Sequence, residues 1–238
     1  MKKSPYLSII VIFTILTLSS SAAVALNLDA VAGQWHDVQG DGALTTYQSA
    51  AVTYGSGQEQ QVRWGAGAGA DGAQSGLGFA ATATPLPLAV GDVFEIGQLR
   101  HFNNPIFAGT EATAVQLSLD LTFAGLNLAT QAFDFRFNID ETLNVDDSPA
   151  SDDLIDFSDA LPTQTFDVDG QTYTLELLGF GLNPDQIQDH FRSTEGATNA
   201  TRLFARISTP PADLAIPEPG TAILLGIGVL LLAYLKRA

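Results

Sequence analysis

Apolar and polar residues alternate along several stretches of this chain. From 115 to 123 every second residue is apolar, and the stretch 133–140 repeats the pattern with three phenylalanines and an isoleucine. The shorter stretches 172–177 and 202–207 alternate in the same way. Because neighbouring side chains on a strand point to opposite faces, each stretch predicts a β-strand with one buried and one solvated face.

Weaker alternation continues this pattern and brings the expected total to roughly nine strands; it covers 50–54, 60–64, 78–82, 92–99 and 165–168. Asp169-Gly170 is a typical two-residue hairpin turn. The segment 184–191 fits a short helix and a loop about equally well. Since no long helical period occurs, the pattern predicts an all-β fold over residues 26–208, an antiparallel β-sandwich that is jelly-roll-like.

The first 25 residues have the three parts of a signal peptide. Lys2-Lys3 supply a positive start, 6–18 form an apolar centre, and Ala23-Val24-Ala25 is a cleavage site of small residues. We therefore expect residues 1–25 to be removed on export, so that the mature protein begins at Leu26. An uncleaved anchor is the alternative.

The C-terminal residues 217–238 also have three parts. Pro217-Glu218-Pro219 is followed by an apolar run of 15 residues, 221–235, and by Lys236-Arg237. Such a run makes about 22 Å of helix, which is short for a membrane span, and the basic pair favours a cytoplasmic end. This array resembles the PEP-CTERM sorting signal, which implies cleavage by an exosortase near the Pro-Glu-Pro box. Residues 209–216, rich in proline, are the expected spacer.

Charge and cysteine content exclude several functions. Residues 26–216 contain six arginines, no lysine and 25 acidic residues, a net charge of −19, compared with −16 for the whole chain. Such a surface repels nucleic acid and anionic lipid, whose binding needs basic patches. The chain has no cysteine, which excludes disulfides, thiolate metal sites and cysteine-based catalysis.

Polar residues of types found in binding sites follow two of the predicted strands directly. His101, Asn103 and Asn104 follow one, and Glu141 and Asn144 follow another. A histidine beside amides and a carboxylate can bind a metal or a sugar. It can equally be a buried ring that bonds a neighbouring loop, next to asparagines that cap turns. These five residues are candidate ligand-binding residues.

The candidates belong to a longer series of short motifs, whose other members are Trp64-Gly65, Ser75-Gly76-Leu77, Gly179-Phe180, Phe191 and Glu195. Their order resembles a bacterial surface-domain family called choice-of-anchor K, which overlaps with the THxN group of PEP-CTERM proteins. The resemblance covers most of 33–208. Arg100 stands where the THxN name has threonine, whereas His101 and Asn103 match it. The resemblance implies placement at the cell surface and no particular activity.

Two further stretches are expected to be loops. The glycine-rich run 65–78 lacks the lysine and the following helix of a phosphate-binding loop, and is expected to be a flexible surface loop. The stretch 141–159 is rich in acids. With oxygen ligands at Asp140, Glu141, Asp146 and Asp147 it is a candidate calcium site, although the spacing is not that of an EF-hand. A solvated acidic loop explains the same composition.

These observations predict an exported, non-catalytic protein with a structural or interaction role at the cell surface or in the extracellular matrix, alongside exopolysaccharide. A carbohydrate-binding module or a polysaccharide-modifying enzyme is the alternative. A binding module should present aromatic side chains on a solvated face, for which Trp35, Trp64, Tyr47 and Tyr54 are the candidates. An enzyme should show a pair of carboxylates in a cleft.

Overall fold

The computed structural model describes residues 26–40, 44–55, 57–124, 129–142, 149–157, 163–168 and 170–209. These residues form β-strands and no helix, which confirms the predicted all-β class. Among them there is no helix of the length and hydropathy needed to cross a membrane. The predicted signal peptide, the sorting segment 217–238 and all but the first residue of the spacer lie outside the described ranges.

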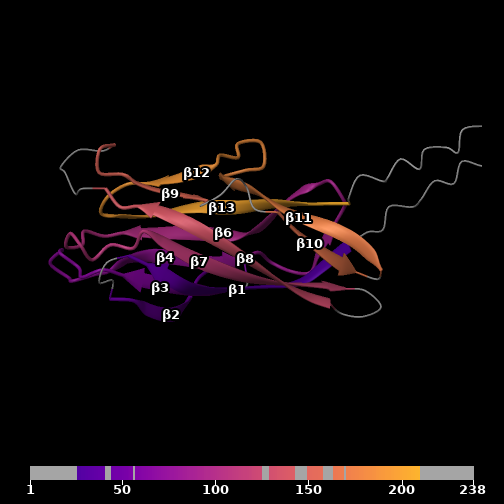
Figure 1. Cartoon of the computed structure of the whole chain (residues 1–238), viewed down its shortest axis with the longest axis horizontal. Coiled ribbons are helices and arrows are strands. Elements are labelled where there is room, and N and C mark those ends of the chain that lie inside the picture. Colours follow the sequence, from indigo (N-terminus) through magenta and orange to yellow (C-terminus); the bar gives the residue numbers. More distant parts are fainter. Residues whose placement is uncertain are drawn as a thin grey trace, which may run out of the picture.

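The strands form two antiparallel sheets that run along the long axis of the domain (Figure 1). The six-stranded sheet has the order β12-β9-β8-β7-β1-β5. Its strands are β1 (Leu26–Gln39), β5 (Leu86–Leu88), β7 (Ala114–Ala124), β8 (Ala129–Asp140), β9 (Asp153–Phe157) and β12 (His190–Ser193). The seven-stranded sheet has the order β10-β11-β13-β6-β4-β3-β2. Its strands are β2 (Thr46–Ala51), β3 (Gln58–Trp64), β4 (Ser75–Ala81), β6 (Val93–Asn103), β10 (Thr163–Val168), β11 (Gln171–Gly181) and β13 (Ala197–Ser208).

The core lies between the sheets and is filled by the apolar faces that the alternation predicted. Every predicted apolar position of β7 and β8 is buried, from Val115 to Phe123 and from Phe133 to Ile139. Rings from the two sheets meet there; Phe180 of β11 lies 4.8 Å from Phe157 of β9, measured between ring centroids. Such burial is the main source of stability in a domain without disulfides.

Some elements differ from the sequence prediction. Of the two predictions for 184–191, the helix was wrong, because a turn precedes β12 there. Within the glycine-rich run, Ser75 already begins β4, whose seven residues are all buried. Gly78 of that strand leaves room for a neighbour, because a Cβ there would lie 2.4 Å from Oε1 of Glu59. Phe204, expected on a solvated face, is also buried.

Both ends of the described chain lie at the same end of the sandwich. Leu26 pairs with Leu88, and three residues later the Gly91 N–H donates a hydrogen bond to the Ile207 carbonyl, next to the end of β13. At this end β6 begins. Its 11 residues then extend roughly 33 Å, at about 3.3 Å per residue, to Asn103 at the opposite end. This distal end holds the candidate site.

Candidate functional site

At the distal end, the inward-facing positions change from apolar to polar. On β6, Ile96 and Leu99 face the core, and His101 and Asn103 continue that face. On β8 the inward face ends at Ile139, and Glu141 follows two residues later. Strand β9 begins with the inward-facing Asp153. Because the two sheets face each other, this continuation brings the polar side chains together between them.

His101, Glu141 and Asp153 form the centre of this cluster. Each offers one ligand atom, and the three atoms lie within 4.8 Å of one another. Nε2 of His101 is 3.9 Å from Oδ2 of Asp153 and 3.5 Å from Oγ of Ser75. The backbone N–H of Thr142 donates to Oδ1 of Asp153 at 2.9 Å. We call these three residues, with Asn103 and Glu195, the polar centre.

Trp64 of β3 holds two members of the polar centre in place. Its Nε1–H donates to Oε1 of Glu141 at 2.7 Å, and its indole ring stacks on the His101 imidazole with ring centroids 6.2 Å apart. Asn103 is fixed through its amide nitrogen, which donates to the Ser193 carbonyl at 3.0 Å. Ser193 is in turn the strand partner of Asp153, so β12 closes the centre on that side.

Several polar atoms of the centre are buried without a hydrogen-bond partner. Within the described residues these are Nδ1 of His101, Oδ1 of Asn103, Oδ2 of Asp153 and both carboxylate oxygens of Glu195. His101, Asn103 and Asp153 are fully buried. Buried polar atoms are nearly always paired, because an unpaired one costs about 1–3 kcal/mol and a charged one costs more. Such a concentration at one point makes the polar centre a candidate functional site.

Burial controls the protonation of the centre. It raises the pKa of the Asp153 carboxyl to about 8, and the neighbouring Glu141 carboxylate contributes to the rise. Burial raises the pKa of Glu141 and of Glu195 as well. It lowers the pKa of His101 to about 3, and the positive charge of Arg63 acts in the same direction. His101 is therefore a neutral imidazole at neutral pH, and the Asp153 carboxyl keeps its proton there unless a cation replaces it.

These shifts predict how stability depends on pH in the presence of a chelator. The pKa of Asp153 is raised above its unfolded value. Its contribution to the free energy of unfolding is therefore fully present below about pH 4 and is lost as the pH rises to about 8. Between pH 6.5 and about 7.5 the unfolded chain still loses the last of its His101 protons, which opposes this fall equally in the wild type and in Asp153→Asn, so comparing the two proteins removes its effect. The melting temperature should therefore fall between pH 6.5 and 8.5, and this fall should be smaller in Asp153→Asn. Parallel curves for the two proteins would contradict this assignment.

The predicted candidates do not all lie in the centre. His101, Asn103 and Glu141 come together there, whereas the Asn104 amide donates to the Gln74 carbonyl at 2.8 Å and holds the glycine-rich loop. Asp140 is exposed on the face of β8 opposite to Glu141. Asn144, Asp146 and Asp147, and the sorting motif Pro217, Glu218 and Pro219, lie outside the described residues.

Sequence reasoning did not select Asp153 as a site residue. Its position in the sequence could have identified it. Asp153, Ile155 and Phe157 alternate with Leu154 and Asp156. A carboxylate therefore occupies the first inward-facing position of this strand. The acid-rich surroundings concealed this alternation. The family resemblance included Trp64, Ser75 and Glu195, and the structure places Trp64 and Ser75 against the polar centre. The negative charge of Glu195 raises the pKa of Asp153, which places Glu195 beside the centre too.

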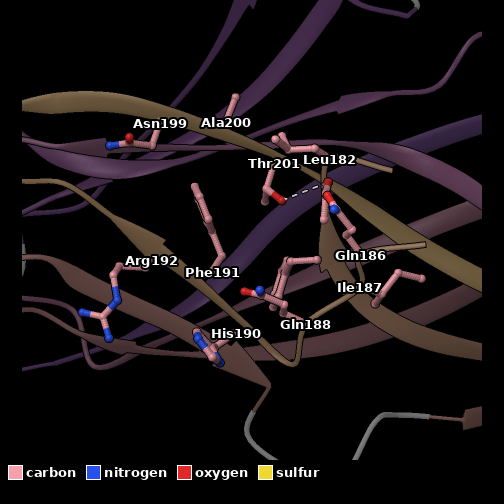
Figure 2. A pocket seen from close by; sticks show the side chains of 12 residues that line it. Leu182, Gln186, Ile187, Gln188, His190, Phe191, Arg192, Asn199, Ala200 and Thr201 are labelled. Atoms are coloured by element: carbon pink, nitrogen blue, oxygen red, sulfur yellow. Dashed lines mark hydrogen bonds between the residues drawn. The ribbon is translucent and has the colours of Figure 1, made fainter. Parts of the chain in front are cut away.

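A groove lies between β12 and β13 (Figure 2). Asn199, which lines it, is the strand partner of His101. The volume of the groove is about 670 Å³, and side chains from β12, β13 and the β11–β12 connection surround it. Gln186, Gln188, Arg192, Asn199 and Thr201 are the polar residues that line it, beside His190. Such a groove offers amide and hydroxyl groups to a polar ligand.

The aromatic residues expected on a solvated face are distributed differently. Trp35 and Trp64 are buried, at 2% and 0% exposure, so that expectation was wrong for both. The Trp35 N–H is satisfied by the Gln60 carbonyl at 2.8 Å, which joins the two sheets. Tyr47 is exposed and Tyr54 is half-buried.

Comparisons with known proteins do not assign this chain to a family. No protein-family model matches the chain, and no curated protein matches its sequence. The sorting signal and the surface-domain resemblance therefore stay predictions from the sequence.

Proposed function

We propose that this chain is an exported, non-catalytic protein of the cell surface or extracellular matrix, with a structural or interaction role alongside exopolysaccharide. In this proposal its domain is a jelly-roll-like β-sandwich, and an exosortase processes its C-terminal segment at the membrane. The two terminal signals support export and sorting. The all-β fold supports a stable extracellular domain that needs no disulfides.

The observation that carries the non-catalytic role is the enclosure of the polar centre. Asp153 has a pKa shifted close to the neutral range in which a general acid works, and His101 lies beside it, but both side chains are fully buried between the sheets. A general acid or base has to come within hydrogen-bonding distance of its substrate. A polysaccharide cannot reach these atoms, so the shifted groups support a role in the architecture of the domain.

The positions of the chain ends support a presenting role. Strand β1 follows the predicted signal peptide, and β13 precedes the predicted spacer. The start of β1 and the end of β13 lie at the same end of the sandwich, near Leu88 and Gly91. A domain attached there holds its distal end, with the polar centre and the groove, away from the point of attachment. That arrangement suits contact with a matrix polymer or another surface protein.

Intact-mass analysis of the protein recovered from its native host tests the export and sorting proposal. We expect a mature chain that begins near Leu26 and lacks residues 221–238, found in the envelope or matrix fraction. Recovery of a mature chain that keeps the full C-terminal segment would contradict processing by an exosortase.

A carbohydrate-binding module is the second candidate function, and the groove between β12 and β13 favours it. Amide side chains such as Gln186 and Gln188 form the bidentate hydrogen bonds that sugar hydroxyls accept and donate. A glycan array probed with the full chain is the test. Binding that is lost in Gln186→Ala/Arg192→Ala, and kept when the exposed Tyr47 is replaced by serine, would place a sugar in the groove. If no glycan on the array bound the chain, the carbohydrate-binding function would be contradicted and the structural role would be favoured.

A further inference from the structure

We propose that the polar centre binds one divalent transition-metal ion, with His101, Glu141 and Asp153 as its protein ligands, and that this ion joins the two sheets of the sandwich. The proposal does not depend on how the protein is exported or on what it contacts at the surface.

The distances within the centre suit an ion. Nε2 of His101 and Oδ2 of Asp153 are 3.9 Å apart, too far for a hydrogen bond. An ion with bonds of about 2.0–2.2 Å to nitrogen and oxygen can touch both atoms at once, because twice the bond length exceeds their separation. Glu141 offers an oxygen within 4.8 Å of the other two ligand atoms, and it must move slightly to share the ion wherever that separation exceeds about 4.4 Å.

The atoms without partners are the second observation. Oδ2 of Asp153 and Oδ1 of Asn103 are fully buried acceptors, and both Glu195 oxygens are buried beside them. A divalent ion would satisfy several of these acceptors together and offset the mutual repulsion of Glu141, Asp153 and Glu195. Asp153 is fully buried, whereas Glu141 and Glu195 are partly buried as whole residues.

The ligand types indicate the class of ion. One neutral imidazole with two carboxylates is a mixed nitrogen and oxygen set, which Zn²⁺, Mn²⁺ and related ions accept. Calcium prefers six to eight oxygen ligands and no imidazole. Trp64 would orient two of the metal ligands. Its N–H donates a hydrogen bond to the Glu141 carboxylate, and its ring stacks on the imidazole of His101.

The ion would connect elements that are far apart in the sequence. His101 belongs to β6 of the seven-stranded sheet, and Asp153 belongs to β9 of the six-stranded sheet. Glu141 follows β8, the neighbour of β9. A bond across the sandwich is what a disulfide supplies in many secreted domains, and this chain has no cysteine. Because the ion binds the folded chain alone, its binding free energy adds to stability.

Metal analysis and thermal melting of the full chain, purified in detergent, test the proposal. The protein is treated with EDTA, exchanged into metal-free buffer and then titrated separately with Zn²⁺, Mn²⁺ and Ca²⁺, with NaCl at matched ionic strength as the control. We expect Zn²⁺ or Mn²⁺ to bind at one ion per chain. At a hundredfold excess over the Kd the melting temperature should rise by roughly 5–10 °C.

Two variants separate the centre from the acidic loop. Asp153→Asn keeps the shape of the side chain and removes its charge, so it should lose the bound ion and the rise in melting temperature. In EDTA it should melt no lower than the wild type, because it removes a buried carboxylate. Asp146→Asn/Asp147→Asn and the exposed Asp120→Asn should both keep the full response.

Three results would overturn the proposal. The first is a wild-type chain that retains no Zn²⁺ or Mn²⁺ and melts alike in all buffers, which would show that the carboxyls are held by protons. The second is a Zn²⁺ or Mn²⁺ response that survives in Asp153→Asn. The third is a response to Ca²⁺ alone that disappears in Asp146→Asn/Asp147→Asn, which would move the ion to the acidic loop.

Discussion

Replacing Leu119 or Phe135 with aspartate is expected to prevent folding. Leu119 lies on β7 opposite Phe133 of β8, and Phe135 lies on β8 opposite Leu117; all four side chains are buried in the core. Each substitution removes a large apolar side chain and places a carboxylate without a partner in its position. The combined cost is about 5 kcal/mol or more, which is comparable with the whole stability of a typical domain.

Gln116→Asp is the matched control for these two variants. Gln116 lies on the outer face of β7 and pairs with Arg136 across the strand, so a carboxylate there gains an opposite charge and keeps its contact with water. Circular dichroism and urea unfolding of the three purified variants would measure the difference. If Gln116→Asp unfolded as readily as Leu119→Asp, the assignment of the two faces of β7 would be wrong.

The second large effect is expected at an ion pair on the outer face of the seven-stranded sheet. Glu59 of β3 is fully buried and accepts hydrogen bonds from Nε of Arg100 at 2.6 Å and from Nε2 of Gln61 at 2.5 Å. Gly78, on the strand between them, provides the space for the Glu59 carboxylate. Arg100→Met would leave that carboxylate buried and without the guanidinium that bonds it directly, at a cost of about 3–5 kcal/mol.

A second ion pair on the same sheet provides the control. Arg202 and Glu95 are 3.1 Å apart on β13 and β6, and the Arg202 side chain is 46% exposed. Arg202→Met should therefore cost less than about 1 kcal/mol. Urea unfolding gives both values, and Glu59→Gln/Arg100→Met should recover part of the loss. Equal costs for Arg100→Met and Arg202→Met would show that burial of Glu59 has no energetic importance.

The strands were predictable wherever one face is dry and the other is solvated, as in β7, β8 and β11. Strands without this contrast were missed, as β1 was, or predicted only in part, as β4 was by the weak stretch 78–82. In β1 only Leu26, Leu28 and Trp35 are buried, and two register shifts interrupt the alternation. In β4 every residue is buried, because Glu59 and other polar side chains cover its outer face, so no alternation remains to be seen. Periodicity records the contrast between two environments, and it disappears when both faces have the same one.

By itself, the sequence determined the all-β class and the acidic character of the domain, and it selected His101, Asn103 and Glu141 as candidate site residues. Only the tertiary structure decided which residues join them. Asp153 and Glu195 reach the polar centre because β9 pairs with β8, and β12 with β9, and because the two sheets face each other. Those pairings depend on contacts between distant segments, which local residue patterns do not encode. The burial that shifts the pKa of Asp153 and His101 arises from the same packing.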